Sequence, residues 1–349
     1  MRTYFWFNQS GYGMTMDMYD KFKRPFRDLR ISVTDRCNFR CRYCMPKEVF
    51  GRDFDFLPRE ELLTFEEIAR LVRIFEGLGL QKIRLTGGEP LLRRDVELLV
   101  GMLRVGSSVE LTMTTNGSLL KKKAALLKAS GLDRVSVSLD ALDDETFMSM
   151  NDVDFSVDRV LEGIEAAKLA GLTPIKVNMV VKRGVNEHSI VPMAEAFREL
   201  GHTLRFIEYM DVGSTNGWRM EDVVPSAEIV KCIDAVHPLE AVEPGYRGEV
   251  AKRYSYRDGR GEIGLISSVT QPFCGDCTRL RMSADGSLYT CLFSARGFDL
   301  KKPLREGAKD ADIREMLTEL WNKRSDRYSE IRTEETAGAS KVEMSFIGG

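Results

Sequence analysis

Residues 29–44 read LRISVTDRCNFRCRYC, and this stretch decides the fold of the chain. Its first half alternates apolar and polar side chains from Leu29 to Thr34, which is typical of a β-strand with one buried face. Its second half places Cys37, Cys41 and Cys44 in a C-x3-C-x2-C pattern. A strand that runs directly into three thiols predicts a soft-metal site at the end of that strand.

The strand-then-helix order of this region repeats along the chain. We predict strands at Leu29–Thr34, Lys82–Gly87, Val109–Thr114, Arg134–Asp140, Ile175–Val181 and Leu204–Met210. We predict helices at Thr64–Gly79, Asp95–Val105, Ser118–Ser130, Phe155–Ala170 and Asn186–Leu200. The first helix opens with a capping box from Thr64 to Glu67. Strands that alternate with helices in this way predict a parallel sheet with right-handed crossovers.

The predicted strands are apolar on one face only. Strands buried on both faces are almost continuously apolar, so the polar face here indicates a curved sheet around a wet cavity. The cations expected to project into it are Arg30, Lys82, Arg84, Lys176 and Arg205. Buried cations need anionic partners, and few acidic residues lie near these cations in the sequence. We therefore expect an anionic ligand in the cavity. An open antiparallel sheet with one solvated face is the alternative.

The alternation of predicted strands and helices ends after Gly217. A helix is expected at Pro225–Val236, then hairpins pairing Val250–Tyr256 with Ile263–Ser268 and Leu280–Ser283 with Leu288–Phe293. We therefore predict an α/β fold: an incomplete (β/α)6 TIM-like barrel over residues 24–220, with a C-terminal α+β appendage over 221–349. Residues 1–23 are expected to form a loose tail.

Composition excludes several classes of protein. The chain has 349 residues, is 43% hydrophobic and carries a formal net charge of −2. A nucleic-acid-binding or membrane-surface protein would show a strong basic excess, so neither partner is expected. No secretory signal or membrane span is recognised, so we expect a cytoplasmic protein with reduced thiols.

Six of the seven cysteines form two triplets. The second, Cys274, Cys277 and Cys291, has C-x2-C-x13-C spacing. Two sets of three thiolates without a neighbouring histidine fit two [4Fe–4S] clusters, each with one iron open to a ligand. A zinc ribbon short of one ligand is the alternative for the second triplet. Cys232 is expected to be a small buried residue of a helix.

The segment Cys37-Asn38-Phe39-Arg40-Cys41-Arg42-Tyr43-Cys44-Met45-Pro46 resembles the signature of the radical S-adenosylmethionine (SAM) superfamily. Four later segments resemble landmarks of the same superfamily: Thr86-Gly87-Gly88-Glu89-Pro90, Thr114-Thr115-Asn116-Gly117, Ser138-Leu139-Asp140 and Arg205-Phe206-Ile207-Glu208-Tyr209-Met210.

From about Leu29 to Gly349 the chain resembles one family within it, the GTP 3′,8-cyclases of molybdenum cofactor biosynthesis. The segments that carry this resemblance are Phe273-Cys274-Gly275-Asp276-Cys277-Thr278-Arg279-Leu280-Arg281, Ala284-Asp285-Gly286, Cys291-Leu292-Phe293 and Phe346-Ile347-Gly348-Gly349. The chain departs from the family at Thr278, where members usually carry Asn, and at Lys341-Val342-Glu343-Met344. Neither departure removes a thiolate or an arginine.

The resemblance implies roles for individual residues. The first triplet would hold the SAM-binding cluster and the second triplet the cluster whose open iron meets the guanine. The matched SAM-binding positions are Tyr43, Gly87, Gly88, Glu89, Pro90, Ser138 and Met210. The matched GTP-binding positions are Arg30, Arg84, Thr114, Lys176, Arg279, Leu280 and Arg281, to which the shared strand face adds Lys82 and Arg205. Gly348 and Gly349 match an end that reaches into the active site.

The resemblance also implies a reaction and its partners. Reductive cleavage of SAM would yield a radical that takes the 3′ hydrogen of GTP, after which C3′ attacks C8 of guanine. The expected partners are a flavodoxin- or ferredoxin-type electron donor and the next enzyme, cyclic pyranopterin monophosphate synthase; the oligomeric state stays open, with a homodimer as one candidate. Two alternatives remain: a two-cluster radical SAM enzyme that modifies a peptide, and a zinc-stabilised nucleic-acid-binding protein.

Overall fold

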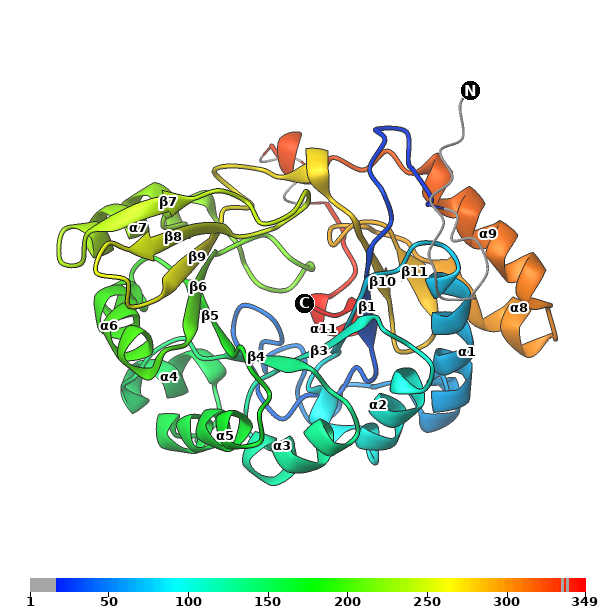
Figure 1. Cartoon of the computed structure of the whole chain (residues 1–349), viewed down its shortest axis with the longest axis horizontal. Helices are drawn as coiled ribbons and strands as arrows, with labels where there is room; N and C mark the ends of the chain where they lie inside the picture. Colours follow the sequence, from blue (N-terminus) through cyan, green and yellow to red (C-terminus); the bar gives the residue numbers. More distant parts are fainter. Residues whose placement is uncertain (1–16, 334–335, 337–338) are drawn as a thin grey trace.

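The computed structural model describes residues 17–333, 336 and 339–349. In this part of the chain all twelve strands join one sheet, in the order β12-β11-β10-β1-β2-β3-β4-β5-β6-β9-β8-β7. Figure 1 shows this sheet curving around a central space, with helices α1 to α6 on its outer side and the C-terminus inside the curve. Whatever occupies that space therefore meets the inner strand face and the end of the chain.

The first six strands follow the predicted positions closely. They are β1 (Asp28–Ser32), β2 (Lys82–Thr86), β3 (Glu110–Thr115), β4 (Arg134–Ser138), β5 (Lys176–Val181) and β6 (Thr203–Glu208). Each pairs with the next in parallel register, so the parallel sheet predicted from the strand–helix order is confirmed and the antiparallel alternative is wrong. The apolar residues of these strands, such as Leu29, Ile31 and Val135, are fully buried in the core under the helices.

The helices that cover the outer face also lie where the apolar periodicity placed them, with one exception. They are α1 (Phe65–Glu76), α2 (Val96–Arg104), α3 (Leu120–Ala129), α4 (Asp144–Asn151), α5 (Val157–Leu169) and α6 (Ile190–Leu200). Thr64 forms the expected capping box, accepting from Glu67 N while the Glu67 carboxylate accepts from Thr64 N. The exception is α4, an additional helix between β4 and α5 that the sequence analysis did not predict.

The C-terminal strands do not form a separate sheet. They are β7 (Leu239–Val242), β8 (Lys252–Tyr256), β9 (Glu262–Ile266), β10 (Arg279–Met282), β11 (Ser287–Tyr289) and β12 (Phe298–Asp299). Both predicted hairpins exist, as β8–β9 and β10–β11, but β9 pairs in parallel with β6 and β10 in parallel with β1. The expected incomplete barrel is thus extended at both edges by strands from the region after residue 220. The division of domains at that residue stays a prediction.

The remaining helices are α7 (Ser226–Asp234), α8 (Lys301–Arg305), α9 (Asp310–Lys323) and α11 (Met344–Ile347). Cys232 lies on α7 but is exposed, so its expected burial is wrong; it lies on the side of the helix away from buried Ile229 and Ile233. Of the expected tail, residues 1–16 lie outside the described residues, whereas Met18 is buried in the core.

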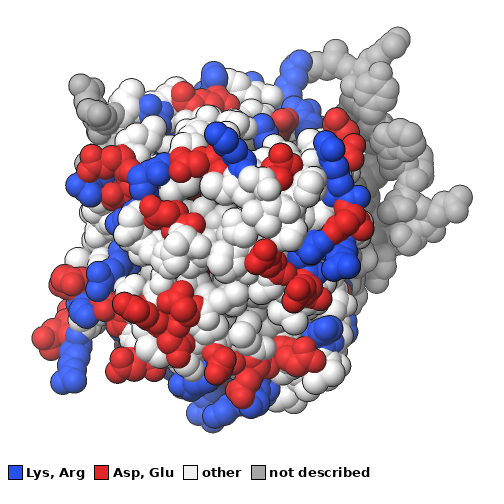
Figure 2. Space-filling model, turned by 90° about the vertical axis from the view of Figure 1, so that its left-hand side faces the viewer, with Lys and Arg blue, Asp and Glu red and all other residues white. Residues whose placement is uncertain are grey.

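The surface shown in Figure 2 carries lysines and arginines interspersed with aspartates and glutamates rather than one uniform basic area. Within the described residues, no helix combines the length and apolarity needed to cross a membrane.

Candidate functional site

A cavity of about 300 Å³ lies inside the curve of the sheet. It is lined by all six cysteines of the two triplets, and its described lining contains no histidine and no seventh cysteine. Of the predicted site residues, those that line it are Arg30, Cys37, Cys41, Tyr43, Cys44, Arg84, Gly87, Gly88, Thr114, Ser138, Arg205, Met210, Cys274, Cys277, Arg279, Arg281, Cys291 and Gly349. The topology thus gathers side chains from both halves of the sequence into one site.

The first triplet lies in the loop that follows β1. The Cys41 carbonyl accepts hydrogen bonds from Cys44 N (2.9 Å) and Met45 N (2.8 Å), which folds the loop into a tight turn. Phe39 N donates to the sulfur of Cys37 at 3.4 Å. Burial raises the pKa of Cys37 to about 12 and also raises the pKa values of Cys41 and Cys44. These thiols become thiolates when a metal replaces the proton.

The second triplet is assembled from two loops. Cys274 and Cys277 lie just before β10, and Cys291 follows β11. Burial acts to raise the pKa of Cys277, but the guanidinium groups of Arg279 and Arg324 outweigh it and lower this pKa to about 6. Arg279 Nη2 donates to the Cys277 sulfur at 3.3 Å. This end of the cavity is therefore rich in arginine, whereas the donors to the Cys37 sulfur are uncharged: Phe39 N at 3.4 Å and Asn116 Nδ2 at 3.8 Å.

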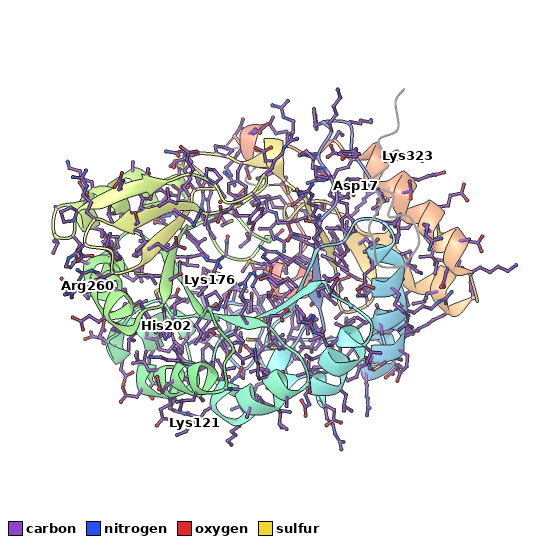
Figure 3. The ribbon with its side chains drawn as sticks, in the orientation of Figure 1. Asp17, Lys121, Lys176, His202, Arg260 and Lys323 are labelled. Carbon is purple, nitrogen blue, oxygen red and sulfur yellow. The ribbon has the colours of Figure 1, made fainter. Side chains whose placement is uncertain are left out.

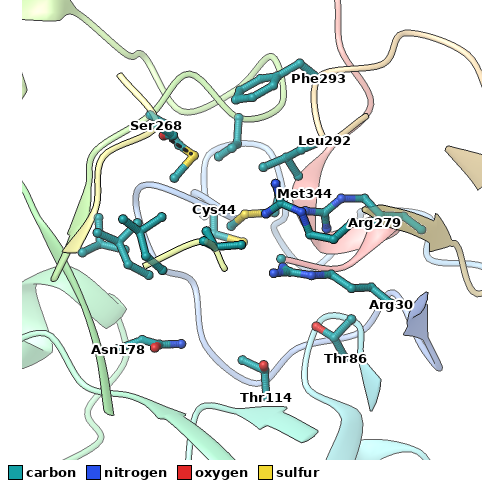
Figure 4. Close-up of a pocket in the computed structure, with 18 of the residues that line it drawn as sticks. Arg30, Cys44, Thr86, Thr114, Asn178, Ser268, Arg279, Leu292, Phe293 and Met344 are labelled. Carbon is teal, nitrogen blue, oxygen red and sulfur yellow. Dashed lines mark hydrogen bonds between the residues drawn. The ribbon is translucent and has the colours of Figure 1, made fainter. Parts of the chain in front are cut away.

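Three arginines form one row across neighbouring strands. Arg281 of β10 pairs in register with Arg30 of β1, and Arg30 pairs with Arg84 of β2. Burial, with contributions from the nearby Arg84 and Arg279, lowers the pKa of Arg30 to about 9. Figure 4 shows Arg30 and Arg279 extending into the same space as Cys44 and Thr114. Adjacent buried cations repel one another, so this row favours an anion in the cavity.

A second cavity of about 80 Å³ continues from the first. Arg30, Arg84, Arg205 and Arg279 line both cavities, and Lys82, Arg134 and Lys176 line the second. Lys176 lies on the inner side of the sheet, in contrast to Lys121 on the outer helical layer (Figure 3). Burial lowers the pKa of Lys176 to about 7, and Arg205 and Arg134 contribute to this lowering.

Lys82 and Arg134 share one acidic partner, Glu110. Lys82 Nζ lies 2.9 Å from Glu110 Oε2, and Arg134 Nε lies 2.6 Å from the other oxygen of the same carboxylate. The alternation of polar residues in β4 could have identified Arg134 as a site residue, but the sequence analysis did not propose it.

The glycine turn after β2 packs against the first cysteine loop. Gly87 has φ +149°, and a Cβ at Gly87 or Gly88 would collide with backbone oxygens of Thr34 or Arg36. Glu89 is buried and accepts hydrogen bonds from Asn116 N (2.7 Å), Leu91 N (3.0 Å) and the Thr115 hydroxyl (2.8 Å). Glycine is required here because two backbones approach closely. Glu89 and Pro90 support this turn without lining either cavity.

The C-terminal tail enters the cavity. Gly349 lines it, and the Gly348 carbonyl accepts a hydrogen bond from Arg281 Nη1. Gly348 has φ +78°, and a Cβ there would strike the Thr86 side chain. Gly348 itself lines neither cavity, and Leu280 of β10 is buried in the hydrophobic core.

Two contacts hold the tail in this position. The Glu343 carboxylate accepts from Ser214 N at 2.9 Å and from Thr215 Oγ1 at 3.1 Å. Lys341 Nζ lies 2.8 Å from Asp211 Oδ2, in a buried ion pair. Ser214, Thr215 and Asp211 all belong to the loop after β6. The same loop contains Met210, whose sulfur accepts from Ser268 Oγ at 3.2 Å.

Tyr43 and Asp140 line the cavity near the first triplet. The Tyr43 hydroxyl donates a hydrogen bond to Asp140 Oδ2 at 2.8 Å. Burial raises the pKa of Asp140 to about 6. Among the described residues, no three His, Cys, Asp or Glu side chains are arranged to hold one metal ion. A [4Fe–4S] cluster does not require three side chains around one metal ion, because each thiolate binds a separate iron.

Several lining residues were missed by the sequence analysis. Arg24 and Arg324 are buried beside the second triplet, and Phe273, Ser268 and Asn178 also line the cavity. Asn178 lies in register with Arg205, so strand alternation could have identified it. Arg24 and Arg324 carry no such signal, because they come from irregular segments far from the cysteines in sequence.

Comparisons with known proteins agree with this geometry. The family model of the radical SAM superfamily matches residues 31–197, and the model described as Molybdenum Cofactor Synthesis C matches residues 202–330. The GTP 3′,8-cyclase of Acidothermus cellulolyticus is 53% identical over 362 residues, covering 96% of this chain and 100% of the relative. The GTP 3′,8-cyclase of Staphylococcus carnosus is 49% identical over 341 residues, covering 96% of this chain and 100% of the relative.

Among solved structures, Streptococcus suis SuiB bound to S-adenosylmethionine matches with a TM-score of 0.60 and 15% identity. The match covers 84% of this chain and 69% of SuiB. At this identity the likeness shows a shared radical SAM fold alone.

Proposed function

This chain belongs to the GTP 3′,8-cyclase family of radical SAM enzymes, and from this premise we propose how its cavity is divided between cofactors and substrate. The enzyme converts GTP to (8S)-3′,8-cyclo-7,8-dihydroguanosine 5′-triphosphate, the first step of molybdenum cofactor biosynthesis. Its cofactors are two [4Fe–4S] clusters and SAM, which when bound supply the radical chemistry that side chains lack. The observation that carries the proposal is that both cysteine triplets and the Arg281–Arg30–Arg84 row line one cavity.

At one end, Cys37, Cys41 and Cys44 hold the SAM-binding cluster. Three soft thiolates without a fourth protein ligand suit a cluster that keeps one iron open. The residues that orient SAM beside it are Tyr43, the Gly87–Pro90 turn, Ser138 and Met210. Gly87 and Gly88 let this turn pack directly against the backbone of Thr34 and Arg36, which holds the turn beside the first cysteine loop.

At the other end, Cys274, Cys277 and Cys291 would hold the second cluster, which would supply an iron site for the guanine. The triphosphate is held by guanidinium and ammonium groups, since arginine forms paired hydrogen bonds with phosphate oxygens. These groups are Arg30, Arg84, Arg279 and Arg281 in the first cavity, with Lys82, Lys176 and Arg205 lining the second. Thr114 accepts from Arg84 Nη1 at 2.9 Å and so fixes its guanidinium.

The tail completes the wall between the two ends through Gly349, while Gly348 ties the tail to Arg281. With the sheet on one side and the tail on the other, the protein orients the ribose and excludes water and competing hydrogen donors. A residue with a side chain at position 348 would displace Thr86, so the tail needs glycine to lie this close to the sheet.

The proposal also includes the electron donor, the enzyme that uses the product and the cellular compartment. A flavodoxin- or ferredoxin-type protein reduces the first cluster, and cyclic pyranopterin monophosphate synthase consumes the product. We place the enzyme in the cytoplasm, where its thiols stay reduced. Residues 24–220 form the SAM-binding part and residues 221–349 the part that carries the second cluster.

Metal analysis and turnover test the proposal together. Anaerobically prepared enzyme is expected to contain about eight irons per chain. Incubated with SAM, GTP and a reductant, it should release 5′-deoxyadenosine only when GTP is present. Zinc without sulfide, or 5′-deoxyadenosine formation that GTP does not change, would contradict it.

A further inference from the structure

Three charged residues that no motif includes lie behind the second triplet. Arg24, Asp20 and Arg324 are all buried, and Asp20 lies between the two arginines. Arg24 Nε lies 2.5 Å from Asp20 Oδ2, and Arg324 Nη1 lies 3.3 Å from the same oxygen. Asp20 also accepts from the backbone nitrogens of Phe22 and Arg24, each at 2.9 Å. The carboxylate thus fixes both guanidinium groups.

The two arginines donate hydrogen bonds to backbone carbonyls at, or next to, each cysteine of the second triplet. Arg24 Nη1 donates to the Cys274 carbonyl at 2.7 Å. Arg324 Nη1 donates to the Cys277 carbonyl at 2.8 Å, and its Nε donates at 3.1 Å to the carbonyl of Thr290, the neighbour of Cys291. Segments that are remote in sequence are therefore held in one arrangement by the Arg24–Asp20–Arg324 triad.

Arg24 retains an unused donor. Its Nη2 is buried and has no hydrogen-bond partner within the described residues, although the side chain lines the cavity beside Cys274 and Cys277. Buried donors in native proteins are nearly always paired, so an isolated one at the edge of a cavity indicates a ligand. The neighbouring acceptors that a bound cluster would add are thiolate and sulfide sulfurs.

We propose that Arg24, oriented by Asp20, is a positioning residue of the second cluster: Nη1 fixes the Cys274 loop and Nη2 donates a hydrogen bond to a sulfur of the bound cluster. This inference rests on the proposed assignment of the second cluster to Cys274, Cys277 and Cys291. Hydrogen bonds to cluster sulfurs raise the reduction potential by stabilising the reduced state, so Arg24 also adjusts that potential.

The experiment compares Arg24→Gln, the more conservative Arg24→Lys and a matched control, Arg104→Gln. Arg104 is a suitable control because it also joins a carboxylate, Asp133 (2.6 Å), to a backbone carbonyl, Gly131 (2.9 Å), but does not line the cavity. Iron and sulfide contents are measured after anaerobic reconstitution. The midpoint potential of each cluster is then measured by EPR-monitored titration.

We expect Arg24→Gln to lose at least about half of the second-cluster iron or to show a lower second-cluster potential, with the first cluster unchanged. Arg24→Lys should shift in the same direction but less, and Arg104→Gln should match the parent. Equal loss of both clusters in either Arg24 variant, or second-cluster iron and potential equal to the parent's, would overturn the inference. A parent enzyme with only about four irons would instead refute the two-cluster assignment on which it rests.

Discussion

The two ends of the cavity hold the same number of thiols but are built in different ways. Cys37, Cys41 and Cys44 come from one short loop after β1, and burial keeps the pKa of Cys37 at about 12. Cys274, Cys277 and Cys291 come from two loops, and Arg279 and Arg324 overcome the effect of burial to lower the pKa of Cys277 to about 6. The first site is thus built from one local loop, whereas the second is assembled by tertiary contacts among arginines.

This difference suits the two ligands we assign. A triphosphate needs cations that converge from several strands, and only tertiary structure can supply them. The SAM end instead offers small residues and backbone, with the glycine turn packed against Thr34 and Arg36. The predictions below test whether the two ends are as independent as this comparison implies.

The largest effects are expected from removing a cluster ligand at either end. Cys41→Ser should abolish SAM cleavage and leave the second cluster in place, with about four irons remaining. Cys274→Ser should spare SAM binding but abolish GTP turnover, again with about four irons remaining. Iron analysis and 5′-deoxyadenosine chromatography distinguish the variants, and loss of both clusters from one substitution would show that the ends are not independent.

Arg84→Met tests the arginine row. A hydrogen bond to a charged group contributes about 1.5–3 kcal/mol, so GTP should bind roughly 10- to 100-fold more weakly while SAM binding stays unchanged. Equilibrium dialysis with each ligand measures both affinities. Arg94→Met is the control, since the Arg94 side chain is 87% exposed. Equal weakening of SAM binding by Arg84→Met would mean that the row does not belong to the GTP end.

Glu343→Ala tests the tail that connects the ends. Losing its hydrogen bonds to Ser214 and Thr215, at about 1 kcal/mol per bond, should free the tail and lower turnover about 30-fold. The thermal unfolding midpoint should stay within about 2 °C of the parent, because the core is untouched. The exposed residue Glu315, changed to Ala, is the control. Parent-like turnover would show that Glu343 does not position the tail.

The smallest effect is a proton taken up at Lys176. Burial and the nearby arginines lower its pKa to about 7, so a fraction of this side chain is neutral at neutral pH. A bound triphosphate favours the charged form, so GTP affinity should fall as pH rises from about 7 to 8, by at most about tenfold. Calorimetry in buffers of different ionisation enthalpy should detect the proton, and Lys176→Met should abolish this dependence. A pH-independent affinity in the parent would contradict the assignment.

The contrast between a local first site and a second site assembled from distant segments also explains which features could be predicted from the sequence. The first triplet and the alternation of β1 are local patterns, so residues 29–44 predicted a strand followed by a metal loop and placed Arg30 on the cavity face. The strand–helix order predicted six parallel strands, and β1 to β6 confirm them. Helix α4 was missed because it has only eight residues, lies between two better-marked elements and is followed by Asp152, which adopts φ +51°.

Features that depend on distant segments could not be predicted. Hairpin signals identified β8–β9 and β10–β11, but nothing in them indicates that β9 joins β6 or that β10 joins β1. The row Arg281–Arg30–Arg84 exists only because of that second pairing. Asp20 was expected to lie in a loose tail, yet it is buried behind the second triplet. Local periodicity has no information about such contacts.

The most direct test of the account is nitrogen hyperfine spectroscopy on the reduced enzyme, prepared once with 15N-labelled GTP and once with SAM carrying 15N in its methionine amino group. We expect the GTP label to couple to the second cluster alone and the SAM label to the first alone. Coupling of both labels to one cluster, or no coupling of GTP to either, would contradict two open clusters that divide one arginine-lined cavity.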